Sequence, residues 1–158
     1  MASFTCKAAL AVLLATLWPG CVTHQCTEMG CRDQARVSAD LPAELGALAA
    51  ELCMNDICKS VELAQSPETS EECVTLDAPQ WGEACLSEAM NGVRRLTISI
   101  DLSQLGARDG DVYTLRVVDE ASGELLLDDA KTASYSELSP NGPDCSPTCH
   151  STELTFVR

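Results

Sequence analysis

Apolar and polar side chains alternate most regularly between residues 109 and 128. From Tyr113 to Val117 every second residue is apolar, which is the two-residue period of a strand with one buried face. The Ala-Ser-Gly segment at 121–123 supplies turn chemistry, because glycine adopts positive φ angles without steric cost. The apolar run Leu125–Leu127 can then return as a partner strand. The pattern therefore predicts a β-hairpin over residues 109–128.

Weaker versions of this pattern recur along the chain. Leu96, Ile98 and Ile100 alternate with polar residues, which predicts a strand over Gly92–Asp101. Further strands are predicted at Arg36–Leu41, Lys59–Leu63, Cys73–Leu76 and Thr152–Val157, and Lys131–Leu138 is expected to prolong the second hairpin strand. Polar or irregular connections are expected at residues 64–72, 77–91, 106–110 and 139–149. Seven or eight short strands without intervening helices predict a mainly β fold, an antiparallel β-sandwich or barrel.

Residues 41–52 support two interpretations. Leu41, Leu45, Leu48 and Leu52 are spaced as on one face of a helix, and Pro42 suits a first helical turn. The alternative is a strand from Leu48 that leads into a hairpin. We expect a short helical turn at Pro42–Leu45 followed by that strand.

The hairpin is predicted at Cys53–Cys58. Asn55 and Asp56 can take the positive φ angles of a two-residue type I′ turn. Cys53 and Cys58 would then face each other as a non-hydrogen-bonded pair with Cα atoms roughly 4.5 Å apart. That spacing is within reach of a disulfide, so this pair is expected to be bonded.

The first residues have the features of a secretory signal. Met1–Trp18 holds one early cation, Lys7, and then an apolar run too short to span a bilayer as a helix. The following Gly20-Cys21 resembles the lipobox of bacterial lipoproteins, in which the cysteine is lipidated and becomes the new N-terminus; Trp18 and Pro19 depart from that motif. The expected organisation is a signal peptide at 1–20, an anchor and tether at 21–30, and a single β domain at 31–158.

Cysteine parity agrees with this organisation. Of ten cysteines, Cys6 would leave with the signal peptide and Cys21 would carry lipid. The remaining eight form an even set, which in an exported chain indicates a disulfide framework. These candidates are Cys26, Cys31, Cys53, Cys58, Cys73, Cys85, Cys145 and Cys149. Six of them precede residue 86, so disulfides are expected to hold the first half and apolar burial the second.

Net charge limits the partners. The chain has a formal charge of −14, and removal of a leader that holds Lys7 makes it −15. Such an acidic protein is not expected to bind nucleic acid or anionic lipid head groups. The membrane would be reached through the lipid on Cys21, and an envelope protein or a polysaccharide is a possible further partner.

Two resemblances bear on the fold. Asp109 and Tyr113 resemble the tyrosine corner of immunoglobulin-like domains, in which the tyrosine hydroxyl bonds to nearby backbone. More extensively, the chain resembles Cys-rich bacterial envelope lipoproteins in the order of four parts. These are Cys26–Cys31, Cys53–Cys58, Asp109–Asp119 and Pro140–Cys149. The resemblance implies an immunoglobulin- or fibronectin-like β-sandwich with a disulfide-rich N-terminal half, displayed on the envelope, and no particular activity.

Candidate chemistry is sparse. Cys145, Cys149 and His150 form C-x3-C-H, one residue longer than a haem attachment motif, and a zinc site there lacks an obvious fourth ligand. His24 and His150 are the two histidines, and no nucleophile motif accompanies either. Carboxylates that could gather around Ca²⁺ are Asp109, Asp111, Asp119, Glu120, Asp128 and Asp129, although no EF-hand spacing is present. Trp81, in a Pro/Gly-containing loop, is expected either at the surface or as a lid on the core.

These observations predict a non-enzymatic envelope lipoprotein, structural or binding, without cofactor or metal. It is expected to be anchored by lipid at the outer membrane, or otherwise periplasmic or secreted. The alternative is an envelope enzyme or a redox or haem carrier that uses Cys145, Cys149 and His150.

Overall fold

A computed structural model describes residues 29–64, 71–76, 81–88, 92–142 and 144–157. The described residues are mainly β and contain no helix. The strands are β1 (Gln34–Pro42), β2 (Leu48–Met54), β3 (Ile57–Leu63), β4 (Glu71–Leu76), β5 (Gly82–Glu88), β6 (Val93–Asp101), β7 (Val112–Asp119), β8 (Leu125–Thr132), β9 (Ser136–Leu138) and β10 (Cys149–Phe156). Nothing in this part of the chain forms a helix long and apolar enough to cross a bilayer.

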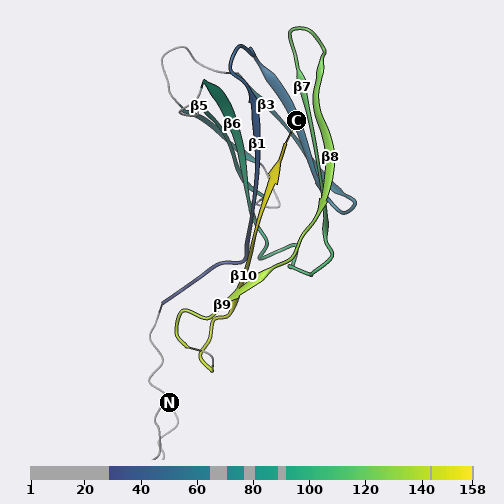
Figure 1. Cartoon of the computed structure of the whole chain (residues 1–158). Helices are drawn as coiled ribbons and strands as arrows, with labels where there is room; N and C mark the ends of the chain where they lie inside the picture. Colours follow the sequence, from purple (N-terminus) through teal and green to yellow (C-terminus); the bar gives the residue numbers. More distant parts are fainter. Residues whose placement is uncertain (1–28, 65–70, 77–80, 89–91, 143, 158) are drawn as a thin grey trace, which may run out of the picture.

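The strands form two sheets that face each other (Figure 1). The first has the order β4-β5-β6-β1-β10-β9, and the second has the order β3-β2-β7-β8. Every pairing is antiparallel except that of β1 with β10, which is parallel. The expectation of a purely antiparallel fold is wrong at this pair. More than 100 residues separate the two strands in the chain, so no local pattern reveals their relative direction.

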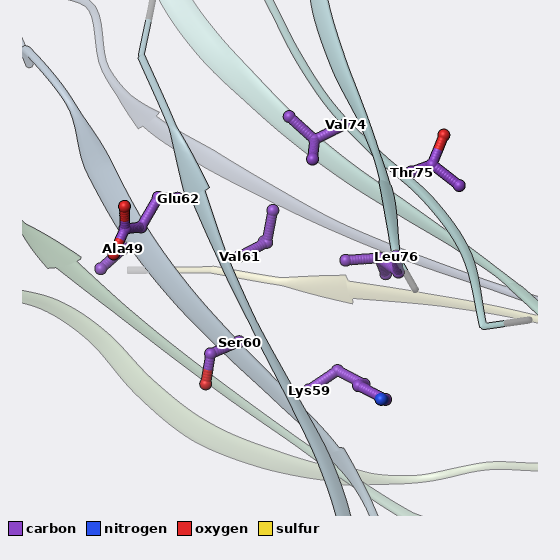
Figure 2. Close-up of a pocket in the computed structure, with 8 residues that line it drawn as sticks. All are labelled: Ala49, Lys59, Ser60, Val61, Glu62, Val74, Thr75 and Leu76. Carbon is purple, nitrogen blue, oxygen red and sulfur yellow. The ribbon is translucent and has the colours of Figure 1, made fainter. Parts of the chain in front are cut away.

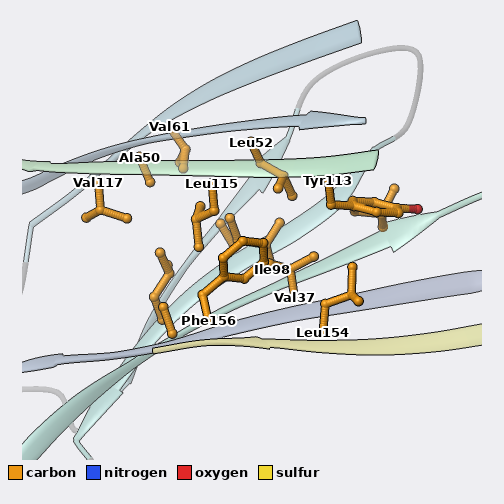
Figure 3. Packing of buried hydrophobic residues seen from close by; sticks show 14 of the residues in the cluster. Val37, Ala50, Leu52, Val61, Ile98, Tyr113, Leu115, Val117, Leu154 and Phe156 are labelled. Atoms are coloured by element: carbon orange, nitrogen blue, oxygen red, sulfur yellow. The ribbon is translucent and has the colours of Figure 1, made fainter. Parts of the chain in front are cut away.

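The core lies between the two sheets and draws on both (Figure 3). Val37, Ile98 and Phe156 of the first sheet point toward Leu52 and Leu115 of the second, and all five side chains are buried. Along β6 and β7 these inward residues alternate with more exposed ones, as the sequence pattern predicts. Burial of this alternating apolar face is the main force that holds the sheets together.

The hairpin over residues 109–128 is confirmed. β7 pairs with β8, and the Ala-Ser-Gly turn between them contains Gly123 with a φ angle of 71°. Asp119 stabilises this turn, because its carboxylate accepts hydrogen bonds from the Ala121 amide at 3.0 Å and from the Ser122 hydroxyl at 2.7 Å. The same residues that signal the turn in the sequence therefore build it.

Residues 41–52 contain two strands rather than a helical turn. β1 continues through Pro42, a turn follows at residues 43–44, and β2 starts at Leu48. The expected helical turn at Pro42–Leu45 is wrong, whereas the expected strand is confirmed. Leu41 and Leu52 are both buried, but they lie in different sheets. Their helix-like spacing therefore arises from two strands that meet at one core.

A further strand lies within the segment that was expected to be irregular, residues 77–91. β5 begins at Gly82 and pairs with both β4 and β6. Trp81 lies immediately before β5 and is fully buried, so of the two expectations for this side chain a place at the surface is wrong. Gly82 has a φ angle of 123°, and a Cβ atom there would lie 2.0 Å from the Ser99 carbonyl oxygen. The turn signals in this segment thus mark a tight approach of two strands.

The second hairpin strand does not extend as far as Leu138. β8 ends at Thr132, and the chain then crosses from the second sheet to the first, where β9 pairs with β10. Ala133 is buried within this crossover. The crossover closes the β8 side of the two-sheet structure, and the opposite side lies between β3 and β4.

Candidate functional site

Disulfides join three pairs of described cysteines. Cys53–Cys58 bridges the β2–β3 hairpin as predicted, with Cα atoms 3.9 Å apart. Cys73–Cys85 joins the facing strands β4 and β5, and Cys31–Cys149 joins the start of the domain to the start of β10. Cys145 is also disulfide-bonded. All seven described cysteines are therefore oxidised, which indicates an oxidising, non-cytoplasmic compartment such as the envelope or the exterior.

The β2–β3 turn differs in detail from its prediction. Met54 pairs with Ile57, which leaves Asn55 and Asp56 as the two turn residues. Asn55 has a φ angle of 53°, but Asp56 is not among the described residues with positive φ, so the turn is not type I′. The Asn55 side chain also holds β7, because its Oδ1 accepts a hydrogen bond from the Val112 amide at 2.9 Å.

The Cys145–His150 segment is held by structural bonds. The Cys149 sulfur is bonded to Cys31, and Cys145 is also in a disulfide. Neither Cys145 nor Cys149 therefore offers a thiol for a haem thioether or for zinc. The His150 amide donates to Asp33 Oδ1 at 2.6 Å, and the imidazole Nδ1 lies 3.3 Å from the same oxygen. On its other side Nε2 lies 3.7 Å from Glu137 Oε1. In the described part of the chain His150 thus contacts two carboxylates rather than the hydroxyl of a nucleophile.

The acidic candidates mostly accept hydrogen bonds from backbone amides. Asp111 Oδ2 accepts from the Arg108 amide at 2.9 Å, and Asp109 Oδ1 accepts from the Tyr135 amide at 2.8 Å. Asp119 caps the β7–β8 turn, and Asp129 Oδ1 accepts from the Ala130 amide at 2.8 Å. The cluster of Glu71 with Cys73 and Cys85 has donor atoms in range of one metal ion, but both of its sulfurs are in a disulfide.

The tyrosine expected to bond to backbone bonds instead to a second tyrosine. The Tyr113 and Tyr135 hydroxyl oxygens are 2.7 Å apart, and Tyr135 in turn donates to Asp111 Oδ2 at 3.2 Å. Burial raises the pKa of both phenols above the ordinary value. The network joins the start of β7 to the β8–β9 crossover. Its function resembles that of a tyrosine corner, but its partner differs.

The start of the described chain is clasped at one end of the molecule. The Met29 amide donates to Asn141 Oδ1, and Asn141 Nδ2 donates to the Met29 carbonyl oxygen, both at 2.9 Å. Asn141 is buried and also donates to the Ser146 carbonyl oxygen at 2.7 Å. Together with Cys31–Cys149, these bonds fasten the chain to the loop before β10. The predicted lipidation site Cys21, together with Cys26 and His24, lies outside the described residues.

A groove lies between the outer strands of the two sheets (Figure 2). It has a volume of about 440 Å³, within the range of ligand-binding sites. Val61 of β3 and Val74 and Leu76 of β4 form its apolar floor, and Lys59 and Glu62 of β3 contribute polar groups. The sequence does not reveal this groove, because its walls come from strands of different sheets. The alternation of Val74 and Leu76 was the one local signal for it.

A second hollow, of about 430 Å³, lies beside the β8–β9 crossover. It is lined by polar residues of β1, β9, β10 and the crossover: Gln34, Arg36, Ser134, Ser136, Ser151, Thr152 and Glu153. Its walls carry hydroxyl and charged groups but no aromatic ring on which a sugar could stack. The β3–β4 groove is therefore the better candidate for a site that binds a partner.

Comparison with known proteins adds no assignment: no family, curated protein or solved structure matches the chain.

Proposed function

We propose that the protein is a non-enzymatic lipoprotein of the bacterial envelope, whose β domain is displayed at a membrane surface as a binding module. The observation that carries the proposal is the oxidation of all seven described cysteines, since a disulfide framework of this density is typical of exported proteins. The lipobox-like Cys21 and the preceding apolar leader support anchoring. An immunoglobulin-like sandwich is the finer fold that we propose for the two facing sheets.

The clasp at Met29 supports an anchored orientation. Seven residues lie between Cys21 and Met29, so their Cα atoms can be at most about 30 Å apart. A lipid on Cys21 would therefore keep the end of the domain with the Cys31–Cys149 bridge near the membrane. The turns at residues 43–47 and 120–124 lie at the opposite end, as Figure 1 shows, and would face outward.

The candidate chemical groups support a role without catalysis. Cys149 and Cys145 are in disulfides, and His150 lies between two carboxylates. The Asp109 carboxylate accepts a hydrogen bond from the Tyr135 amide, and the Asp111 carboxylate accepts from the Arg108 amide and the Tyr135 hydroxyl. No observation among the described residues favours the alternative of a haem or redox carrier.

Metabolic labelling with a palmitate analogue in a bacterial host tests the anchor. The wild-type protein and a Cys6→Ala control are expected to be labelled equally, because Cys6 lies in the leader. The Cys21→Ala variant is expected to lose the label and to leave the membrane fraction. Label retained by Cys21→Ala would reject the proposal.

A further inference from the structure

The four edge strands of the two sheets differ in how well they are protected from pairing with a further strand. An outer strand exposes unpaired amide and carbonyl groups, and proteins usually protect it with charges or by keeping it short. β8 carries two aspartates at its centre, β3 carries Lys59 and Glu62, and β9 has three residues. In β4 the two charged residues, Glu71 and Glu72, lie together at its start, and residues 73–75 are uncharged. Among the described strands, β4 is therefore the edge most open to a further strand.

The pairing of β4 with β5 shows which of its backbone groups are free. Directly facing residues of antiparallel strands alternate between wide, hydrogen-bonded pairs and narrow, non-hydrogen-bonded pairs. Cys73 and Cys85 have Cα atoms 4.0 Å apart, so they form a narrow pair. The amide and carbonyl groups of Cys73, and by alternation those of Thr75, point away from β5. No hydrogen bond found among the described residues uses these groups.

The groove beside this edge suits apolar side chains. Val61 and Leu76 on its floor are buried, whereas Val74 is only partly buried although it faces the core side of β4. A strand paired with β4 would place alternate side chains over Val74 and Leu76, in the space that Figure 2 shows between β3 and β4. Those side chains would complete the burial of Val74.

The charges at the groove favour a basic partner. The two strands that line it carry three carboxylates, Glu62, Glu71 and Glu72, and one ammonium group, Lys59. The whole chain has a net charge of −14. A partner with basic residues at the positions that do not face the floor would be attracted to this side of the molecule.

We propose that the free edge of β4 binds an extended peptide with alternating apolar and basic residues, as an added strand of the larger sheet. The backbone of the peptide bonds to Cys73 and Thr75, and its apolar side chains fill the β3–β4 groove. This mode of recognition combines main-chain hydrogen bonds for affinity with alternating side-chain contacts for specificity. The inference deepens the proposed binding role and does not depend on the lipid at Cys21.

The test uses the full exported chain and a labelled synthetic peptide of alternating valine and lysine, slightly longer than β4. Saturable binding is expected by fluorescence anisotropy. A scrambled peptide of the same composition is expected to bind at least tenfold more weakly, and so is a peptide N-methylated along one edge. Equal binding of all three peptides would show that they bind by non-specific charge attraction, and it would overturn the proposal.

Two matched proline variants identify the edge. Thr75→Pro removes a free amide of β4 without removing a β4–β5 hydrogen bond, and it is expected to weaken binding at least tenfold. Ser60→Pro changes the corresponding edge of β3 and is expected to weaken binding less than twofold. Circular dichroism and the disulfide count check that both variants fold. If Thr75→Pro fails to fold, Val74→Lys, which puts a charge on the floor, is expected to give the same loss.

Three results would overturn the inference. Binding lost in Ser60→Pro but kept in Thr75→Pro would assign the edge to β3. A wild-type dimer that Thr75→Pro dissociates would identify the occupant as a second copy of the chain. Absence of peptide binding would reject strand addition. It would not affect the proposed lipid anchor, which palmitate labelling tests separately.

Discussion

At the scale of single residues, the tyrosine pair has the clearest consequence. Tyr113 and Tyr135 are the two tyrosines of the chain, and their hydroxyl groups are joined by a 2.7 Å hydrogen bond. Burial is the main cause that raises the pKa of each phenol, and Asp111 beside them raises both further. Ionisation of either phenol would place a negative charge against Asp111 in a partly dehydrated site, so both pKa values are raised in the folded protein.

Stability is therefore expected to fall at alkaline pH. In the unfolded chain both phenols lose their protons near pH 10, whereas in the folded chain they lose them only at higher pH. The stabilisation is complete below pH 10 and decreases above it, by up to about 1.4 kcal/mol per pH unit for each tyrosine. Urea unfolding between pH 8 and 11, with tyrosinate absorbance recorded in parallel, measures this slope.

The Tyr135→Phe variant is the control, since it removes one titrating group. It is expected to halve the alkaline slope and to lower stability near neutral pH by about 1 kcal/mol. Tyrosinate absorbance that develops near pH 10 while the protein remains folded would contradict the account.

Gly82 gives a second prediction at this scale. Gly82→Ala would put a Cβ atom 2.0 Å from a backbone oxygen of Ser99, at a φ angle of 123° that L-residues rarely adopt. The free energy of unfolding is expected to drop by about 3 kcal/mol or more. Gly46→Ala, which has no atom within 4 Å of the added Cβ, is expected to change it by less than about 0.5 kcal/mol. Equal effects of both substitutions in thermal unfolding would show that the backbone at Gly82 does not lie in close contact with Ser99.

At the scale of strands and bridges, the sequence predicts elements where alternation is local and regular. Residues 113–117 and 96–100 alternate, and both form strands with buried inward faces. The Cys53–Cys58 bridge was also predictable, because a two-residue turn fixes which residues face each other. In each case the pattern and the contact lie within a few residues of each other.

Features that depend on distant contacts were not predictable. The parallel pairing of β1 with β10 joins Gln34 to Ser151, and no local pattern encodes it. β5 was missed because Gly82 and Pro79 resemble loop residues, although Ala84 and Leu86 alternate inward and are buried. The β3–β4 groove lies between different sheets, so its position follows from the assembled fold.

The two bridges at the start of the domain are expected to be redundant. Cys31–Cys149 encloses a separation of 118 residues. Cys145 is also disulfide-bonded, and we expect its partner to be Cys26, the one remaining cysteine of a chain that has lost its leader and carries lipid on Cys21. While one bridge closes the long loop, the other closes a ring of only roughly ten residues. Cys145→Ser and Cys149→Ser are therefore each expected to cost about 3 kcal/mol, and both together about 7 kcal/mol.

Chemical denaturation of the three variants measures this coupling. The matched control is the double variant Cys53→Ser/Cys58→Ser, which opens a separation of only 5 residues and is expected to cost about 2 kcal/mol. The redundancy would be refuted if the double variant lost no more unfolding free energy than the two single variants lose in sum.

At the scale of the whole molecule, the two sides of the facing sheets differ. On one side only residues 133–135 connect β8 to β9, and Ala133 is buried within this connection. On the other side the edges of β3 and β4 border the apolar groove. The clasp of Met29 and Asn141 fixes the chain at one end, whereas the groove is lined by residues of β2, β3 and β4 that take no part in the clasp.

The intact mass of the protein purified from the envelope, before and after reduction, tests the central claim most directly. The account predicts a chain that lacks residues 1–20, carries acyl groups on Cys21, and gains about 8 Da on reduction because four disulfides each take up two hydrogen atoms. An unprocessed chain that keeps its leader and does not change mass on reduction would contradict it.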